Sequence, residues 1–324
     1  MPSNNFALPK PILGPLAQIS LVGLLLLLPG QNFYSTLELK PSATQVQASS
    51  YHLPVSPYPQ NLHQSSPPPL TATAALAIDP DSAVILHQKN IHEKLYPAST
   101  TKMMTALVAI ESFALDQVIT VGQITTPPQK IHLLPGETIT IENLLYATLV
   151  ASGNDAAEAL AAAFPDGREA FIVAMNSKAT ALHLTNTHFT NPTGFDFVNH
   201  YSSALDLARL ATSALKNPTF ARIVSTPKIS VFSADSKIEH KLTNINQLLG
   251  RLDGVKGVKT GYTEEAGEAL VALTERNGHQ ILTVVLGSQD RFGETEKLIE
   301  WAFSNHQWID PTNTTNTTNK QIND

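Results

Sequence analysis

Apolar and polar positions along residues 71–305 follow two different periods. Apolar residues recur at helical spacing in five segments, and a sixth follows near the end of this region. Ser99 and Thr140 stand where the first two helices are expected to begin, because a hydroxyl side chain there can accept a bond from a free backbone N–H group. The predicted helices are residues 100–113, 140–150, 155–164, 166–182, about 203–216 and 294–303.

Short apolar runs at both ends of the region are typical of strands instead. Two runs flank Asp79-Pro80-Asp81-Ser82 and two flank Asn277-Gly278, and both separators favour hairpin turns. The predicted strands are residues 74–78, 83–86, 254–261, 268–274 and 280–287. Strands at both ends with helices between them predict an α/β (α+β) fold, in which helices flank an antiparallel sheet beside an all-helical lobe.

The first 70 residues have a different character. Lys10, Glu38 and Lys40 are their only Lys, Arg, Asp or Glu residues, and Ile19–Leu28 is a mostly apolar block that contains one serine and one glycine. A basic residue before a short apolar block is typical of an export signal. We therefore predict a signal peptide or N-terminal membrane anchor over 1–30, with attachment through residues 11–28 in the second case. The sequence leaves cleavage and anchoring open.

Proline and polar residues predict two unstructured segments around the folded unit. Residues 31–70 are rich in Pro and Ser, which favours an extended, solvated linker. Residues 306–324 end in a polar Asn/Thr repeat, so we expect a disordered tail. The catalytic domain is expected to comprise the 71–305 segment.

Composition excludes several functions. Only 15% of the 324 residues are charged, against about 25% in ordinary soluble domains, and the net charge is −6. A nucleic-acid binder needs a basic surface to replace phosphate counterions, so nucleic acid is not an expected partner. The absence of cysteine excludes disulfides, a thiol nucleophile and Cys-ligated metals. The histidines form no His-Glu-x-x-His motif, and no metal site is predicted.

Candidate chemistry begins with Ser99-Thr100-Thr101-Lys102 at the start of the first helix. Residues three apart share a helix face, so the Lys102 amine can reach the Ser99 hydroxyl. A lysine acts as a base when burial or a positive neighbour lowers its pKa. The same pattern recurs at Ser213-Ala214-Leu215-Lys216 and Ser225-Thr226-Pro227-Lys228, but neither copy opens a long apolar helix.

Two further motifs follow. Ser152-Gly153-Asn154 separates two predicted helices, where it fits either a simple helix break with Asn154 as the next N-cap or a polar pair facing a substrate. Lys259-Thr260-Gly261 ends a predicted strand, where it fits either a surface lysine before a turn or a fixed cation beside a strand edge. Each motif alone is weak.

Together the motifs are specific. Ser-x-x-Lys, a Ser-x-Asn motif and Lys-Thr-Gly occur in this order in penicillin-binding proteins and class A β-lactamases. Their first residues here lie 53 (99 to 152) and 107 (152 to 259) positions apart. The chain resembles the low-molecular-weight penicillin-binding proteins, the serine D-alanyl-D-alanine carboxypeptidases of the S11 type. The resemblance covers about residues 71–305 and includes the segments 96–105, 134–137, 149–157, 191–194 and 258–263.

The resemblance implies a β-lactamase/transpeptidase-like fold and a role for each motif residue. Ser99 is the expected nucleophile, Lys102 its base and Ser152 a proton relay. Asn154, Lys259 and Thr260 are expected to bind the substrate, together with Gly261 along the strand edge. The backbone N–H groups of Ser99 and Tyr262 are expected to form the oxyanion hole. The implied list is therefore catalytic Ser99, Lys102 and Ser152, and substrate-binding Asn154, Lys259, Thr260, Gly261 and Tyr262.

The same resemblance implies partners and a location. The expected substrate is a peptidoglycan stem peptide ending in D-Ala-D-Ala, β-lactams are expected to be covalent inhibitors, and no cofactor is implied. The enzyme is expected outside the cytoplasmic membrane. His200 matches a family position, where we expect a structural hydrogen-bonding role. One departure is local: Glu268 and Ala269 stand where the family often has an aromatic residue and a cysteine.

Three alternatives remain open. A D,D-endopeptidase acting on peptide cross-links shares every motif. A class A-like β-lactamase needs a deacylating glutamate downstream of the middle motif, and no glutamate lies between Glu169 and Glu239. A non-catalytic penicillin-binding protein on the same fold is disfavoured because every motif side chain is present.

Overall fold

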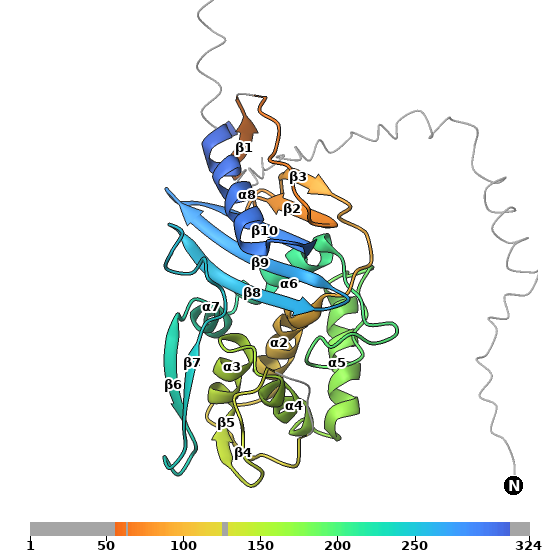
Figure 1. The fold of residues 1–324 in the computed structure, drawn as a ribbon, viewed down its shortest axis with the longest axis vertical. Helices are drawn as coiled ribbons and strands as arrows, with labels where there is room; N and C mark the ends of the chain where they lie inside the picture. The colour runs from red at the N-terminus through yellow and green to blue at the C-terminus, as the bar shows by residue number, and fades with distance from the viewer. Residues whose placement is uncertain (1–55, 63, 125–128, 312–324) are drawn as a thin grey trace, which may run out of the picture. The chain divides into compact units, whose positions relative to one another are not determined.

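The computed structural model describes residues 56–62, 64–124 and 129–311. Within them, a five-stranded antiparallel sheet lies beside a group of helices (Figure 1). The sheet order is β3 (Ile85–Lys89), β2 (Ala74–Ile78), β10 (His279–Ser288), β9 (Gly267–Arg276) and β8 (Val255–Thr263). The expected fold class is confirmed, as is the hairpin turn at Asn277-Gly278, where His279 pairs with Arg276.

Alternation along the strands gives the sheet two apolar faces. In β2, Leu76 contacts the large core shared with the helical lobe, whereas Ala77 packs with Leu298 and Ala302 of α8 (Arg291–Asn305). Successive strand side chains point to opposite sides, so α8 covers one face and the helical lobe covers the other. Both faces are therefore buried, which matches the continuous apolar runs in β9 and β10.

The helical lobe forms between β3 and β8. Thr140 and Ser203 accept the N-cap bonds of α3 and α6 from Asn143 N and Asp206 N, as expected of hydroxyl residues at these positions. The elements are η2 (Ala98–Thr101), α2 (Lys102–Ser112), α3 (Ile141–Leu149), α4 (Asn154–Ala162), α5 (Gly167–Ala181), α6 (Ala204–Leu215) and α7 (Pro218–Val224). Every predicted helix is present, with ends shifted by up to three residues.

Five short elements between β3 and β8 were not anticipated. Helix α7 begins with Pro218 after Asn217, whose side chain accepts two N-cap bonds, and this start signal is readable in the sequence. Two small hairpins, β4–β5 (Val118–Thr120, Thr138–Thr140) and β6–β7 (Lys228–Phe232, Glu239–Thr243), are mostly polar on one side. Their short, half-exposed strands carry little apolar signal.

Two domain boundaries differ from the prediction. Strand β1 (Tyr58–Asn61) lies inside the expected linker and pairs antiparallel with β11 (His306–Ile309), which lies inside the expected tail. Trp308 anchors this pair, because its ring stacks on His279 at 4.4 Å and its indole N–H donates to Asp79 Oδ2 at 2.6 Å. Long-range pairing and aromatic packing give these polar segments a fixed structure that their composition does not indicate.

The predicted signal or anchor over 1–30, most of the linker and residues 312–324 lie outside the described residues. In the part of the chain that is described, none of the helices combines the length and apolar character needed to cross a bilayer.

Candidate active site

Ser99 lies in a tight turn rather than at the cap of a long helix. The 3₁₀-helix η2 carries Ser99 as its second residue, and α2 begins three residues later at Lys102. Side chains three apart eclipse one another in a 3₁₀-helix, so Lys102 Nζ lies 2.8 Å from Ser99 Oγ. The expected Ser–Lys contact is present, although Ser99 makes no cap bond.

Lys102 is completely buried. Besides Ser99, its Nζ donates to Asn154 Oδ1 at 2.7 Å and to the carbonyl oxygen of Thr193 at 2.6 Å. Burial, followed by the positive charge of Lys259, lowers the pKa of Lys102 well below its usual value. A neutral amine keeps two N–H donors for Asn154 and Thr193 and has a lone pair left to accept the Ser99 proton.

The junction between α3 and α4 supplies the second motif. Ser152 adopts a left-handed backbone at φ +58°, Gly153 occupies the N-cap of α4, and Asn154 is its first residue. The interpretation of Asn154 as an N-cap is therefore wrong. Its side chain points instead at Lys102, and the Ser152 hydroxyl accepts a bond from Lys259 Nζ at 2.9 Å.

The third motif, Lys259-Thr260-Gly261, lies on β8, which is an edge strand of the five-stranded sheet. Lys259 is buried, and burial, with the nearby Arg291 charge, lowers its pKa to about 7. A Cβ on Gly261 would lie 2.9 Å from Ala98 Cβ and 3.0 Å from Ser99 N. Glycine therefore lets β8 closely approach η2, the turn that carries the expected nucleophile Ser99 and is called the nucleophile turn below.

A cavity of about 670 Å³ joins these parts. It is lined by Ser99, Ser152, Asn154, Thr260, Gly261 and Tyr262. Lys102 and Lys259 do not line it but contact the lining hydroxyls of Ser99 and Ser152. All eight predicted site residues therefore come together around one cavity. Tyr262 is 60% exposed.

Arg291 was not found by sequence reasoning. It starts α8, lines the cavity and donates from Nη1 to the carbonyl oxygen of Gly261 at 2.9 Å. Its backbone N–H donates to Glu268 Oε2 at 2.8 Å. Glu268, one of the two residues that depart from the family pattern, therefore contacts Arg291 in the site. No local pattern marks Arg291, because it lies 30 residues beyond the strand residue that it contacts.

The loop 191–194 and His200 make hydrogen bonds to residues that directly follow Ser99, namely Lys102 and Thr101. Asn191 Oδ1 accepts backbone bonds from Thr193, Gly194 and Phe195 and so fixes the carbonyl group that contacts Lys102. His200 accepts from Thr190 N at Nδ1 and lies 2.9 Å from Thr101 Oγ1 at Nε2. Burial lowers the pKa of His200 to about 4, so it is neutral near pH 7, and its expected hydrogen-bonding role is confirmed.

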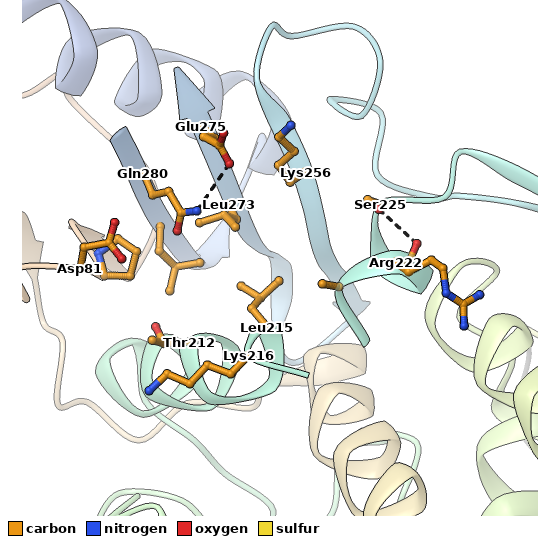
Figure 2. Close-up of a pocket in the computed structure, with 13 residues that line it drawn as sticks. Asp81, Thr212, Leu215, Lys216, Arg222, Ser225, Lys256, Leu273, Glu275 and Gln280 are labelled. Carbon is orange, nitrogen blue, oxygen red and sulfur yellow. Dashed lines mark hydrogen bonds between the residues drawn. The ribbon is translucent and has the colours of Figure 1, made fainter. Parts of the chain in front are cut away.

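The other two Ser-x-x-Lys copies form no comparable pair. Figure 2 shows Lys216 and Ser225 around a separate cavity of about 490 Å³, which shares no lining residue with the Ser99 cavity. Ser225 Oγ donates to the Arg222 carbonyl at 3.1 Å, and Lys216 and Lys228 are exposed. Neither lysine is buried, in contrast to Lys102.

Comparison with known proteins agrees with this geometry. The family model of peptidase S11, D-alanyl-D-alanine carboxypeptidase, matches residues 61–290. D-alanyl-D-alanine carboxypeptidase DacF of Bacillus subtilis is 35% identical over 246 residues, which cover 73% of this chain and 63% of DacF. A D-alanyl-D-alanine endopeptidase of Pseudomonas aeruginosa is 32% identical over 254 residues, covering 73% of this chain and 82% of the relative.

The crystal structure of the Streptomyces K15 DD-transpeptidase has the same fold, with a TM-score of 0.70 and 31% identity. The match covers 74% of this chain and all of that one. This chain thus spans less than two thirds of DacF but the whole of the K15 fold. On the family match and these relatives, the chain belongs to the peptidase S11 family of D-alanyl-D-alanine carboxypeptidases.

Proposed function

We propose that this protein is a serine-type D-alanyl-D-alanine carboxypeptidase, which removes the terminal D-alanine from peptidoglycan stem peptides. The observation that carries the proposal is the 2.8 Å contact between a fully buried Lys102 and the Oγ of Ser99, which lines an open cavity. Family membership and the carboxypeptidase names of several relatives support the substrate.

Acylation begins when Ser99 Oγ attacks the carbonyl carbon between the two D-alanines, and neutral Lys102 accepts the hydroxyl proton. The N–H groups of Ser99 and Tyr262 stabilise the resulting oxyanion, which is worth roughly 3–4 kcal/mol per donor in comparable enzymes. The position of Gly261 against the Ser99 backbone supports this assignment, because it holds the strand beside the turn.

The leaving D-alanine needs a proton and a binding site. Protonated Lys259 and the Thr260 hydroxyl bind its carboxylate, and Asn154 binds the peptide backbone. Ser152 passes a proton to the leaving amine as the C–N bond breaks; its contact with Lys259 supports this role. Water then hydrolyses the Ser99 ester and regenerates the enzyme.

β-Lactams are expected to form the same ester, and this gives the direct test. Mass spectrometry after benzylpenicillin treatment should find one adduct, on the peptide containing Ser99. The Ser99→Ala variant should show no adduct and no D-alanine release, whereas Ser213→Ala, in a matching motif outside the cavity, should behave as wild type. An adduct elsewhere, or normal turnover by Ser99→Ala, would contradict the proposal.

Cross-link cleavage is the second candidate, because the relative from Pseudomonas aeruginosa is named an endopeptidase. Digestion of purified cross-linked peptidoglycan separates the two. Free D-alanine supports the carboxypeptidase, and uncrosslinked muropeptides without free D-alanine support the endopeptidase.

The proposed substrate lies in the cell wall, so we place the enzyme outside the cytoplasmic membrane, with residues 1–30 as its export signal or anchor. Alkaline extraction of membranes distinguishes the two forms: an anchored protein stays in the pellet, and a cleaved one is released.

A further inference from the structure

Gln129 bridges the two ends of the turn 151–154, which carries Ser152. The backbone carbonyl oxygen of Gln129 accepts a bond from Asn154 N at 2.8 Å, and its side-chain Nε2 donates to the carbonyl oxygen of Ala151 at 2.9 Å. Gln129 also lines the cavity of the candidate active site. One residue from another segment therefore bonds the residues on both sides of Ser152, at the wall of the cavity.

The bridged turn has a backbone that depends on surrounding contacts. Ser152 lies at φ +58°, a left-handed conformation that residues other than glycine rarely adopt and that persists where the neighbouring structure holds it. The loop after Gln129 also packs closely on this turn, because a Cβ on Gly153 would lie 3.2 Å from Ile131 Cγ2. The position of the Ser152 hydroxyl therefore depends on where the loop 129–137 lies.

Asp155 is the first anchor of this loop. Its Oδ1 accepts a bond from Ile131 N and its Oδ2 accepts one from Leu133 N, both at 3.1 Å. Asp155 is buried and does not line the cavity, although it directly follows Asn154 in the chain. Its carboxylate therefore fixes the loop and the start of α4 to one another.

His240 of β7 is the second anchor. Its Nε2 donates to Glu137 Oε1 at 2.7 Å, and its Nδ1 lies 3.2 Å from the carbonyl oxygen of Ile131. The other carboxylate oxygen of Glu137 accepts a bond from Leu134 N at 3.0 Å. His240 and Glu137 are both buried, and neither lines the cavity. Any effect of this pair on the reaction must therefore pass through the loop.

We propose that Gln129 is a positioning residue for Ser152 and Asn154. The two anchors hold the loop that carries Gln129, so the β6–β7 hairpin contributes to the site without touching it. The inference rests on the proposed function, because the effect of Gln129 is exerted on the proton relay through Ser152. Loss of the bridge should impair protonation of the leaving amine more than the other steps of acylation.

A change of leaving group isolates this effect. An amine leaves only with a proton on its nitrogen, whereas the alcohol of an ester is a better leaving group and depends less on a general acid. The two substrates are Nα,Nε-diacetyl-L-Lys-D-Ala-D-Ala and the ester analogue that ends in D-Ala-D-lactate. The readout is the amide-to-ester ratio, which is kcat/KM for the peptide divided by kcat/KM for the ester. A variant with less active enzyme loses both rates equally and keeps this ratio.

Gln129→Met is the main variant, because it removes the amide donor but keeps an unbranched side chain. Gln129 is exposed, so we expect this variant to fold. Its amide-to-ester ratio should fall about three- to tenfold below that of the wild type, as for the loss of one hydrogen bond. Gln117→Met changes an exposed glutamine that does not line the cavity and should keep the wild-type ratio. Ser152→Ala should lower the ratio at least as far as Gln129→Met.

The second anchor is tested at His240, at a temperature where circular dichroism shows the variants folded. His240→Leu removes both contacts with the loop and should lower the amide-to-ester ratio by at least about twofold. His240→Gln has an amide that can donate to Glu137, so it should keep more of the ratio than His240→Leu.

Failure of the inference and failure of the proposed function give different results. If the wild type cleaves both substrates but the ratio in Gln129→Met stays within about twofold of wild type, Gln129 has no positioning role, whatever happens to its Tm. An unchanged ratio in His240→Leu overturns the anchoring role of His240, and an unchanged ratio in Ser152→Ala overturns the relay and the inference with it. Cleavage of neither substrate by the wild type, with no penicillin adduct on Ser99, overturns the proposed function.

Discussion

Gly194 offers a sharp test of how tightly the nucleophile turn is held. Its φ is +88°, and a Cβ there would lie 1.9 Å from the carbonyl oxygen of Ala98 and 2.9 Å from Thr101 Oγ1. Contacts below 3.0 Å essentially never occur for a real Cβ, so the Gly194→Ala change must separate the two segments by more than about 1 Å. Ala98 directly precedes Ser99, and a misplacement of about 1 Å in an active site can cost on the order of 100-fold in rate.

Gly136 provides a matched control, because its φ is +86° and no atom lies within 4 Å of the position that an added methyl group would take. Gly136→Ala therefore introduces the left-handed backbone strain alone, about 1–2 kcal/mol. That strain lowers the Tm of a domain of this size by about 2–8 °C. The acylation rate of Gly136→Ala should stay close to that of the wild type, because this change does not move the nucleophile turn.

The assay is the second-order rate constant for acylation by a fluorescent penicillin, measured at a temperature where circular dichroism shows both variants folded. Gly194→Ala should be acylated at least about 100-fold more slowly than Gly136→Ala. Rates within about threefold of one another would refute the reasoning, because the nucleophile turn would then tolerate the displacement.

Three further predictions follow from charge, hydrogen bonding and strand pairing. In the proposed mechanism Lys102 acts as a neutral amine, and burial lowers its pKa, whereas Lys259 binds as a cation with a pKa of about 7. The value of kcat/KM should therefore rise through the pKa of Lys102 and fall above about pH 7, and Lys259→Arg should remove the alkaline fall in a pH–rate profile. Asp155→Ala leaves two loop N–H groups without their acceptor and should destabilise the protein by about 2–4 kcal/mol in urea titrations, with an unchanged free energy of unfolding contradicting this. A chain ending after Asn305 lacks β11 and should melt at a lower temperature than one ending after Pro311; equal Tm values would show that β1–β11 pairing adds no stability.

Local patterns in the sequence were sufficient for the elements that depend on neighbouring residues. The cap at Thr140 and the turn at Asn277-Gly278 need only a side chain and the backbone within a few positions. The ordered motifs indicated the family resemblance, and the family match and the fold are in agreement with it. Polar, half-exposed hairpins such as β6–β7 were missed, because their stability comes from packing rather than from an apolar period.

Only the tertiary structure distinguished the three candidate lysines by their surroundings. Three Ser-x-x-Lys copies have the same spacing, but only Lys102 is buried, and burial lowers its pKa; Lys216 and Lys228 are exposed. The contact between Ser152 and Lys259 joins residues 107 positions apart, and Arg291 reaches Gly261 across 30. Such contacts depend on how the sheet packs against the helical lobe. The sequence by itself determined the chemical groups and their order, and the packing determined their distances, their burial and hence their protonation.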